Sequence, residues 1–544
     1  MVSGCRERSF VARGKRSQEK MGVLRRVCGA IGLVLAMTLG VVAVLLLVAI
    51  IRAVTIEGED YRDPGLEGLV REELPGSYLQ TLPELMGRAL AIPTVSTAPG
   101  DYDTDQLLRF HAFLRESFPH AFNASFIEVE VINNYSFLFT IKGSDPKHQP
   151  YLLAAHMDVV PVDTAKWTQD PWSGQVIPDP ETGEDFVWGR GAIDDKLGVM
   201  GIMMALDYMV SSGFQPTRSF YVAFGHDEEV HGEDGAGHIG RLLEERGIAL
   251  DFVLDEGMPV LDGVMAGMEI PVAAIGVTEK GWMRVRLDVD GEGGHSSIPP
   301  HDQAVTRLAS ALVNLHRHPQ PSMFGKGTEA DLLTLMAHKA SWPHKLVFAN
   351  TWLFEPLLKM IMSRSRETNA IIRTTTAATI VRAGVKENVV PASAWAIINH
   401  RVHPAQALDD VVQHDLAAIN DPLVRVTVEE TREAHPISPY GPHVPGWRLL
   451  AATVAQIFPE AVTVPSMLVG NTDTKSYLSL SRCVYRFLPV RMTKRDIQTI
   501  HGHDERVSSR AVGKAASFYH RLILTADVGA HALHSRPGHR SGEL

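Results

Sequence analysis

The sequence predicts an α/β domain with a largely parallel, mixed sheet covered by helices, interrupted by an inserted α+β domain. An apolar helical stretch at 198–209 and a half-exposed strand at 282–290, where apolar and polar residues alternate, support this prediction. Short, continuously apolar segments, as expected for strands buried on both faces, occur at 151–155, 219–224 and 251–254.

The change from continuous to alternating apolar segments marks the expected domain boundaries. Strands at 394–398 and 424–428 and a helix at 304–315 continue the insert. The expected order is a basic N-terminus, an apolar run, a linker, the first part of the α/β catalytic domain, the insert, its second part and a disordered tail, at residues 1–26, 27–51, 52–77, 78–272, 273–438, 439–525 and 526–544.

The overall composition is that of a folded globular protein. The chain has 544 residues, of which 45% are hydrophobic and 21% are charged. Its net charge is −11 and no basic stripe runs through the folded part, so a nucleic-acid partner is not expected. Cys483 is the only cysteine beyond the apolar run, which excludes a disulfide within the folded part.

The N-terminal segment predicts export to the secretory pathway. Residues 1–26 carry eight lysines and arginines against two glutamates, and the following run at 27–51 has no charge. A run of this length fits a spanning helix of roughly 20 residues better than a signal-peptide core of roughly 7–15. The basic flank favours a type II signal anchor with the folded part lumenal or extracellular. Cleavage near Ala53, which would give a secreted protein, and a start at Met21 remain open alternatives.

Acidic and histidine side chains follow each apolar segment of the first domain. Since ligands gather beyond the carboxyl ends of parallel strands, these side chains are expected to converge on one crevice. Carboxylates and imidazoles without thiolates suit Zn²⁺, Mn²⁺ or Co²⁺, and a pair of such ions needs a bridging carboxylate. The candidates are His156, Asp158, Asp194, Glu228, Glu229, Asp255 and, far downstream, His501.

This ordered set of motifs resembles the co-catalytic zinc aminoacylase and carboxypeptidase superfamily. Further segments resemble its N-fatty-acyl-amino-acid synthase/hydrolase family, namely 143–147, 354–358, 369–376 and 470–473. The resemblance extends from about Tyr78 to about Leu524. It implies two zinc ions per chain, one held by His156 and Asp255 and the other by Glu229 and His501, bridged by Asp194, and a cis peptide bond after Asp194.

The resemblance also implies the catalytic and substrate-binding residues. Glu228 would be the general base, and Asp158 would orient His156. In the insert, His295 would help to stabilise the oxyanion in a neighbouring active site across a dimer, or would instead make a hinge hydrogen bond in a lid. Lys475, at a position where the family usually has arginine, and Asn388 are the candidate substrate-binding residues.

The implied activity is reversible hydrolysis of N-fatty-acyl amino acids to a free fatty acid and an amino acid, with the insert serving as a lid and dimerisation domain of a possible homodimer. The apolar segment 332–362 would either line an acyl-chain groove or belong to the core. A Gly-X-type carboxypeptidase or dipeptidase on the same scaffold is the alternative. A catalytically silent carrier of N-acyl amino acids is disfavoured, because Glu228 and every expected ligand are present.

Overall fold

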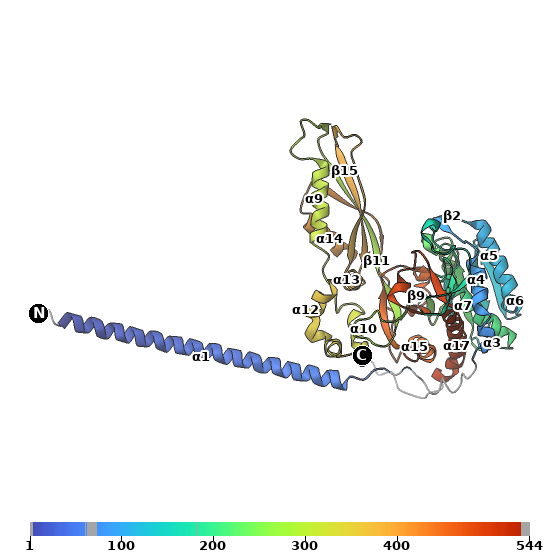
Figure 1. The fold of residues 1–544 in the computed structure, drawn as a ribbon, viewed down its shortest axis with the longest axis horizontal. Coiled ribbons are helices and arrows are strands. Elements are labelled where there is room, and N and C mark those ends of the chain that lie inside the picture. Colours follow the sequence, from blue (N-terminus) through green and yellow to red (C-terminus); the bar gives the residue numbers. More distant parts are fainter. Residues whose placement is uncertain (1–3, 60, 62–72, 181, 535–544) are drawn as a thin grey trace.

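The computed structural model describes residues 4–59, 61, 73–180 and 182–534. A long helix, α1 (Gly4–Thr55), projects from a body that contains two main sheets (Figure 1). The part of α1 at Ala30–Thr55 is long and apolar enough to cross a membrane. This agrees with the predicted signal or anchor, although residues 1–3, 60 and 62–72 lie outside the described part of the chain.

The larger sheet forms the α/β domain. Within the described residues it has eight strands in the order β17-β10-β18-β9-β5-β8-β4-β3. The pairs β8–β5, β5–β9, β9–β18 and β10–β17 are parallel, so the predicted largely parallel, mixed sheet is confirmed. The strands are β3 (Ile127–Ile132), β4 (Ser136–Ile141), β5 (Tyr151–His156), β8 (Phe220–Gly225), β9 (Val253–Leu261), β10 (Val272–Glu279), β17 (Val462–Leu468) and β18 (Val484–Met492).

Helices cover both faces of this sheet, because successive strand residues point to opposite sides. In β5, Leu153 packs with the core of one face, whereas Leu152 and Ala154 pack with that of the other. The first face is covered by α4 (Leu82–Leu90), α5 (Thr104–Ser117), α7 (Lys196–Ser211), α15 (Pro445–Ile457) and α17 (Ser509–His534), and the second by α8 (Ala236–Glu245).

The second sheet belongs to the insert, which rises beside the α/β domain (Figure 1). Its antiparallel order is β13-β15-β11-β16, and burial alternates along β11 as its sequence predicts. It is formed by β11 (Gly281–Asp290), β13 (Thr375–Ala383), β15 (Ser393–Val402) and β16 (Val424–Arg432), and it packs on α9 (Ala304–Arg317) and α14 (Leu408–Ile419).

The insert differs from the predicted range 273–438 in two ways. β10 pairs with β17 in the large sheet, so the second sheet begins at Gly281. Residues near 324–362 pack against Val462 and Val464 of β17, because their buried leucines and methionines cover this end of the large sheet. These residues include α10 (Glu329–Met336), α11 (His344–Phe348) and α12 (Thr351–Met362), which α13 (Arg366–Ile372) follows.

The prediction of a disordered tail from residue 526 is wrong up to His534. Helix α17 continues through these residues, and the side chain of Ala526 is fully buried. The remainder of the predicted tail, 535–544, lies outside the described residues.

The remaining elements are short connections around the two sheets. They are the helices α3 (Gly76–Leu79), α6 (Pro119–Asn123) and α16 (Lys494–Ile497) and the strands β1 (Ser96–Ala98), β2 (Asp101–Tyr102), β6 (Val176–Pro178), β7 (Asp185–Trp188), β12 (Gly294–His295), β14 (Val389–Val390) and β19 (Arg506–Ser508).

Candidate metal centre

The predicted crevice lies where the parallel strands β8, β5 and β9 run side by side. His156 is the last residue of β5, and Asp255 lies in β9. Glu228 and Glu229 open a short 3₁₀ helix soon after β8. Since the strands are neighbours and parallel, residues far apart in the sequence meet at one site.

His156 is held so that one ring nitrogen faces carboxylates. Its Nδ1 lies 3.0 Å from the backbone oxygen of Asp158 and 3.3 Å from Asp158 Oδ1. Its Nε2 lies 3.0 Å from Asp194 Oδ1 and 3.4 Å from Glu256 Oε1. A proton on Nδ1 that is donated to Asp158 leaves Nε2 as the lone-pair nitrogen that a metal ligand requires.

Asp194 lies between two imidazoles, as a bridging carboxylate must. Its Oδ2 lies 2.9 Å from His501 Nε2, and the same nitrogen is 3.1 Å from Glu229 Oε2. Two ligands on one tetrahedral zinc ion are separated by about 3–3.5 Å, because each metal–ligand bond is about 2.0–2.2 Å. The observed separations are close to this range, and His156, Asp194 and Glu229 together form a group that could hold a metal ion.

Asp158 also positions the segment that carries the predicted base. Its Oδ1 accepts a hydrogen bond from the backbone N–H of Glu228 at 3.0 Å, and its Oδ2 accepts one from Glu229 at 3.2 Å. Because Asp158 contacts His156 as well, one buried carboxylate connects the base segment to a predicted metal ligand. Burial, together with the nearby Glu256 carboxylate, raises the pKa of Glu228 well above its ordinary value.

Glu256 is a candidate ligand that the sequence analysis missed. It forms a second potential metal group with His156 and Asp195. The predicted ligand Asp255 is buried beside it, with Oδ1 accepting from the Glu256 backbone N–H at 2.9 Å and no hydrogen-bond partner for Oδ2 among the described residues. Adjacent acids in one strand point to opposite sides, so only the tertiary structure could distinguish them.

Asp195 has a local structural role, as a residue at the start of a helix often has. Its side chain caps α7 by accepting from the Gly198 backbone N–H at 3.1 Å. The peptide bond between Asp194 and Asp195 is cis, which confirms the expectation.

A buried glutamate holds the segment before Asp194. The Oε1 of Glu505 accepts from the backbone N–H groups of Ile193 at 2.8 Å and Asp194 at 3.2 Å. Its Oε2 accepts from Arg190 Nη1 at 2.6 Å and from the Gly191 backbone at 3.1 Å. This role of Glu505 was not predicted from the sequence, in which its only signal is that Glu505 closely follows His501.

The site holds more buried negative charge than its histidines can balance. Burial and the Asp194 carboxylate raise the pKa of Glu229 to about 7, and burial raises that of Asp255 to about 6. Buried carboxylates require cations or hydrogen bonds. Divalent cations would satisfy both needs, since buried oxygens without a described hydrogen-bond partner occur on Asp195, Glu229, Asp255 and Asp473.

Two predicted residues, His295 and Asn388, lie together in the insert. β12 pairs with β14, and the Ser296 backbone N–H donates to the Asn388 backbone oxygen at 3.2 Å. His295 is exposed, and its Nδ1 accepts from the Ser297 backbone N–H at 3.2 Å. Among the described residues, neither side chain contacts the metal centre of its own chain, so their roles remain predictions.

Two further cations are candidates for holding a substrate carboxylate. Lys475 donates to the backbone oxygen of His231 and lies 3.9 Å from Glu233. Arg401, which was not predicted from the sequence, extends from β15 of the insert to the side chain of Asn471. Asn471 in turn donates to the Lys280 backbone oxygen at 3.1 Å, so Arg401 links the insert to the α/β domain.

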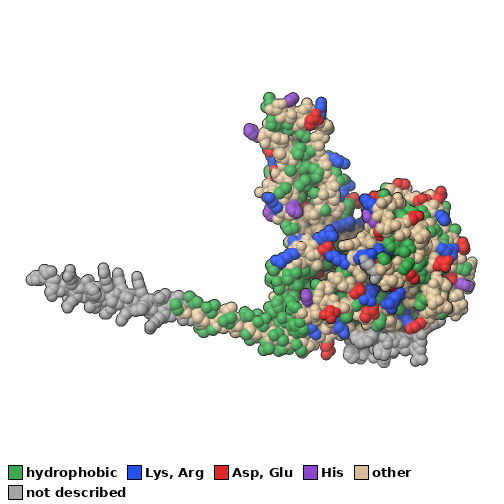
Figure 2. Space-filling view, in the orientation of Figure 1, with side chains coloured by type: hydrophobic (Ala, Val, Ile, Leu, Met, Phe, Trp, Pro, Cys, Tyr) green, Lys and Arg blue, Asp and Glu red, His purple; other side chains and the backbone are tan. Residues whose placement is uncertain are grey.

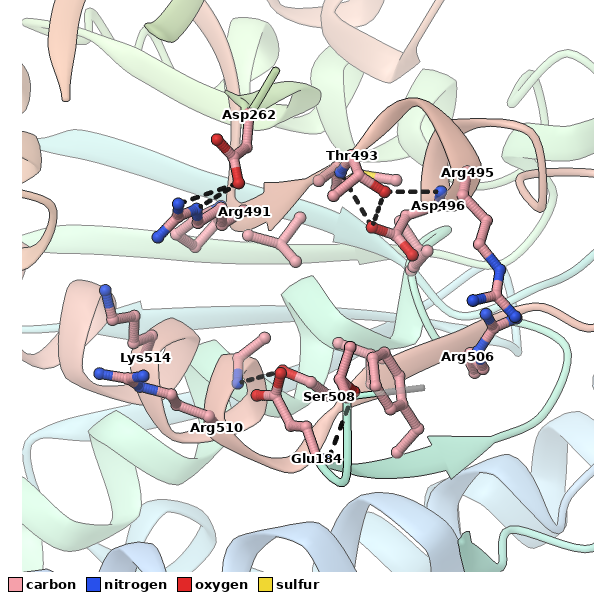
Figure 3. Close-up of a pocket in the computed structure, with 18 of the residues that line it drawn as sticks. Glu184, Asp262, Arg491, Thr493, Arg495, Asp496, Arg506, Ser508, Arg510 and Lys514 are labelled. Carbon is pink, nitrogen blue, oxygen red and sulfur yellow. Dashed lines mark hydrogen bonds and ion pairs between the residues drawn. The ribbon is translucent and has the colours of Figure 1, made fainter. Parts of the chain in front are cut away.

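A separate cavity of about 860 Å³ lies between β18, α16 and the start of α17 (Figure 3). None of the predicted site residues lines it. Arg491 pairs with Asp262 at 2.9 Å, and Arg495 lies 3.6 Å from Asp179. Because the arginines and lysines that line it are matched by equally many acids, its charge does not favour a charged ligand.

The conserved-domain comparison decides the family. The family described as peptidase family M20/M25/M40 matches residues 152–525, a range that contains every predicted metal ligand. The chain belongs to this peptidase family. The M20 match and the two potential metal groups identify a metal-dependent enzyme.

Curated M20 relatives are similar over most of the chain. N-fatty-acyl-amino acid synthase/hydrolase PM20D1 of Xenopus tropicalis is 39% identical over 485 residues, which are 89% of this chain and 93% of the relative. The Homo sapiens protein of that name is 40% identical over 82% of this chain and 88% of its own. Probable carboxypeptidase S-like 2 of Dictyostelium discoideum is 37% identical over 81% of this chain and 84% of its own.

Solved structures confirm the M20 fold. The M20 metallo-carboxypeptidase Sso-CP2 from Sulfolobus solfataricus has a TM-score of 0.58 at 15% identity, covering 84% of this chain and all of that chain. Human carnosine dipeptidase 1 has a TM-score of 0.56 at 15% identity, covering 83% of this chain and 96% of that chain.

Proposed function

We propose that this M20 enzyme is a two-zinc amidohydrolase that reversibly hydrolyses N-fatty-acyl amino acids. The observation that carries the proposal is Asp194 lying between His156 and His501, with Glu228 held beside them by Asp158. The names and high coverage of the vertebrate relatives support this substrate class.

The residues divide the reaction between charge stabilisation and proton transfer. Zinc ions, when bound, would polarise the acyl carbonyl and lower the pKa of a bound water. Glu228 accepts a proton from the attacking water as the C–O bond forms. It then donates that proton to the amide nitrogen as the C–N bond breaks, releasing a fatty acid and an amino acid. The reverse sequence joins the two products, and their concentrations set the net direction.

The amino-acid carboxylate needs a cation on the other side of the scissile bond. Lys475 is the residue predicted from the sequence, and its ammonium can pair with one carboxylate at a time. Arg401 offers a planar guanidinium that can bind a carboxylate with two hydrogen bonds. The two cations come from different domains, so substrate binding would be sensitive to the position of the insert.

A carboxypeptidase or dipeptidase is the second candidate function. It is favoured by the 37% identity to a probable carboxypeptidase of Dictyostelium discoideum. The two candidates differ in the acyl side of the bond, because one requires a fatty-acyl chain and the other an aminoacyl group.

The proposal places the enzyme in or beyond the secretory pathway. Helix α1 would act as a signal anchor, with the body on the lumenal or extracellular side, or as a signal that is cleaved. Two chains would associate through the insert, so that His295 of each chain serves the site of the other.

The test is hydrolysis of N-oleoyl-phenylalanine by the full chain loaded with zinc. We expect oleate release in the parent and in a Glu245→Gln control, which changes an exposed glutamate on α8. Glu228→Gln should reduce kcat by at least about 100-fold, because it removes the proton carrier. Faster turnover of a dipeptide panel than of the N-oleoyl substrate would instead support the peptidase function.

A further inference from the structure

Helix α12 is apolar on the side that faces away from the protein. Its inner side packs on the core through Phe354, Leu358 and Met362, at i, i+4 and i+8. The outer side carries Trp352, Pro356 and Met360 at the same spacing, with Leu357 and Ile361 beside them. A surface helix normally places polar residues on its outer face, so this pattern favours an apolar neighbour.

The exposure of this outer face is large. Trp352, Met360 and Ile361 are 51%, 49% and 50% exposed, and the nearby Trp342 is 55% exposed. The charges on the flank neutralise each other, because Lys359 Nζ and Glu355 Oε1 are 2.5 Å apart. We call this surface the α12 apolar face, defined by Trp342, Trp352, Pro356, Leu357, Met360 and Ile361.

The α12 apolar face lies next to the end of the candidate membrane span. Asn350 Nδ2, directly before α12, donates to the Ala49 backbone oxygen of α1 at 2.9 Å. Arg52 Nε donates to the Ala349 backbone oxygen at 3.4 Å. Ala49 and Ala53 are fully buried in this contact.

The position of that contact determines where the α12 apolar face lies along the membrane-spanning part of α1. Ala49 still belongs to the uncharged run 27–51, so the body touches α1 within the apolar part of the helix. At 1.5 Å per residue, Trp352 to Ile361 spans about 14 Å. Figure 1 places α12 on the side of the body from which α1 projects, and in Figure 2 the hydrophobic surface of α1 continues onto the body.

We infer that the α12 apolar face lies in the interfacial layer of the same lipid bilayer that α1 spans. Apolar side chains rimmed by tryptophan are typical of a helix that lies in a membrane surface without crossing it. The occupant is a lipid surface and not a second copy of the chain, because the face is continuous with the membrane span. The inference rests on α1 remaining in the membrane.

This surface would also bring the enzyme to its substrate. An N-fatty-acyl amino acid partitions into a bilayer through its acyl chain. An enzyme whose body rests in the interface meets that substrate at a higher local concentration than in water. This second part rests on the proposed function, whereas the contact with lipid does not.

The contact is tested on the full chain in phosphatidylcholine nanodiscs. Nitroxide labels at Leu357→Cys and Ile361→Cys, in a background without Cys5, Cys28 and Cys483, report collision with oxygen and with a water-soluble nickel chelate. The control is Val385→Cys, an exposed apolar position of the insert. We expect oxygen to be favoured at 357 and 361 and the nickel chelate at 385. Equal nickel access at all three would overturn the inference, as would spin–spin broadening at 357 that disappears when the labelled chain is diluted with unlabelled chain.

A kinetic comparison separates the lipid contact from the catalytic proposal. Leu357→Glu combined with Ile361→Glu should lower kcat/KM for N-oleoyl-phenylalanine in bilayers by roughly tenfold, because charges oppose interfacial insertion. It should leave soluble N-butanoyl-phenylalanine unchanged, and Val385→Glu should affect neither. Equal losses on both substrates would overturn the delivery role. A parent chain that hydrolyses neither substrate would contradict the proposed function. The spin-label test of lipid contact would still be valid, because it does not depend on activity.

Discussion

Asp255 and Glu256 are adjacent acids of which the proposed zinc site needs one. Asp255 has a buried oxygen without a described hydrogen-bond partner, which a metal ion would satisfy, whereas Glu256 lies closer to His156. We therefore expect Asp255→Asn to reduce bound zinc from two ions to about one per chain, and Glu256→Gln to reduce it less. Metal analysis after dialysis checks this. The opposite ranking would assign the ligand role to Glu256.

The protonation of His501 determines how the zinc affinity is expected to depend on pH. Hydrogen bonds to Asp194 and Glu229 raise the pKa of His501 to about 10, so the metal-free chain holds this proton at neutral pH. Zinc must displace it, and acid therefore competes with zinc. We expect apparent zinc affinity to increase from pH 6 to 8, and the slope of log Kd against pH to become shallower by about one in His501→Gln.

A chelator competition series measures that slope. The exposed His503, two residues away, provides the control, since His503→Gln should keep the parental slope. An unchanged slope in His501→Gln would mean that this histidine releases no proton on zinc binding.

At the scale of secondary-structure elements, α17 ties the end of the chain to the large sheet. Asp527 Oδ1 accepts from the backbone N–H groups of Thr217 at 2.7 Å and Arg218 at 2.8 Å, just before β8. Asp527→Ala leaves both donors without this acceptor, and we expect unfolding to become easier by about 1–3 kcal/mol. Urea denaturation checks this value. Asp101→Ala, at an exposed position, should change stability by less than about 0.5 kcal/mol.

At the scale of the whole molecule, His295 is exposed in the insert and, among the described residues, makes no contact with the metal centre of its own chain. If His295 acts across a dimer, mixing Glu228→Gln with His295→Ala should restore activity. Half of the randomly mixed dimers contain one of each chain, and each such dimer has one complete site, so we expect about a quarter of the parental rate. Mixed dimers that form without recovering activity would exclude this role for His295.

The residue types and their order were sufficient to predict the family and the metal chemistry. His156 ends β5 and Glu229 follows β8, so the rule that parallel strands end at one edge brings these two residues together before any coordinates are known. Asp194 and His501 do not directly follow strands of this sheet, and only the order of the motifs pointed to them. The chemistry could be predicted because it depends on side-chain type and strand order, and both can be read along the chain.

The features that could be established only from the tertiary structure depend on contacts between segments distant in sequence. The roles of Glu505 and Arg401 come from backbone and amide groups far away in sequence. The continuation of α17 beyond residue 526 was not predicted from the local sequence, whereas in the structure Ala526 is buried and Asp527 accepts hydrogen bonds from the backbone just before β8. Tertiary contacts also decided between the two expectations for the apolar segment 332–362. α10 is core and the outer side of α12 is surface, because periodicity shows that a face is apolar and only packing shows what covers it.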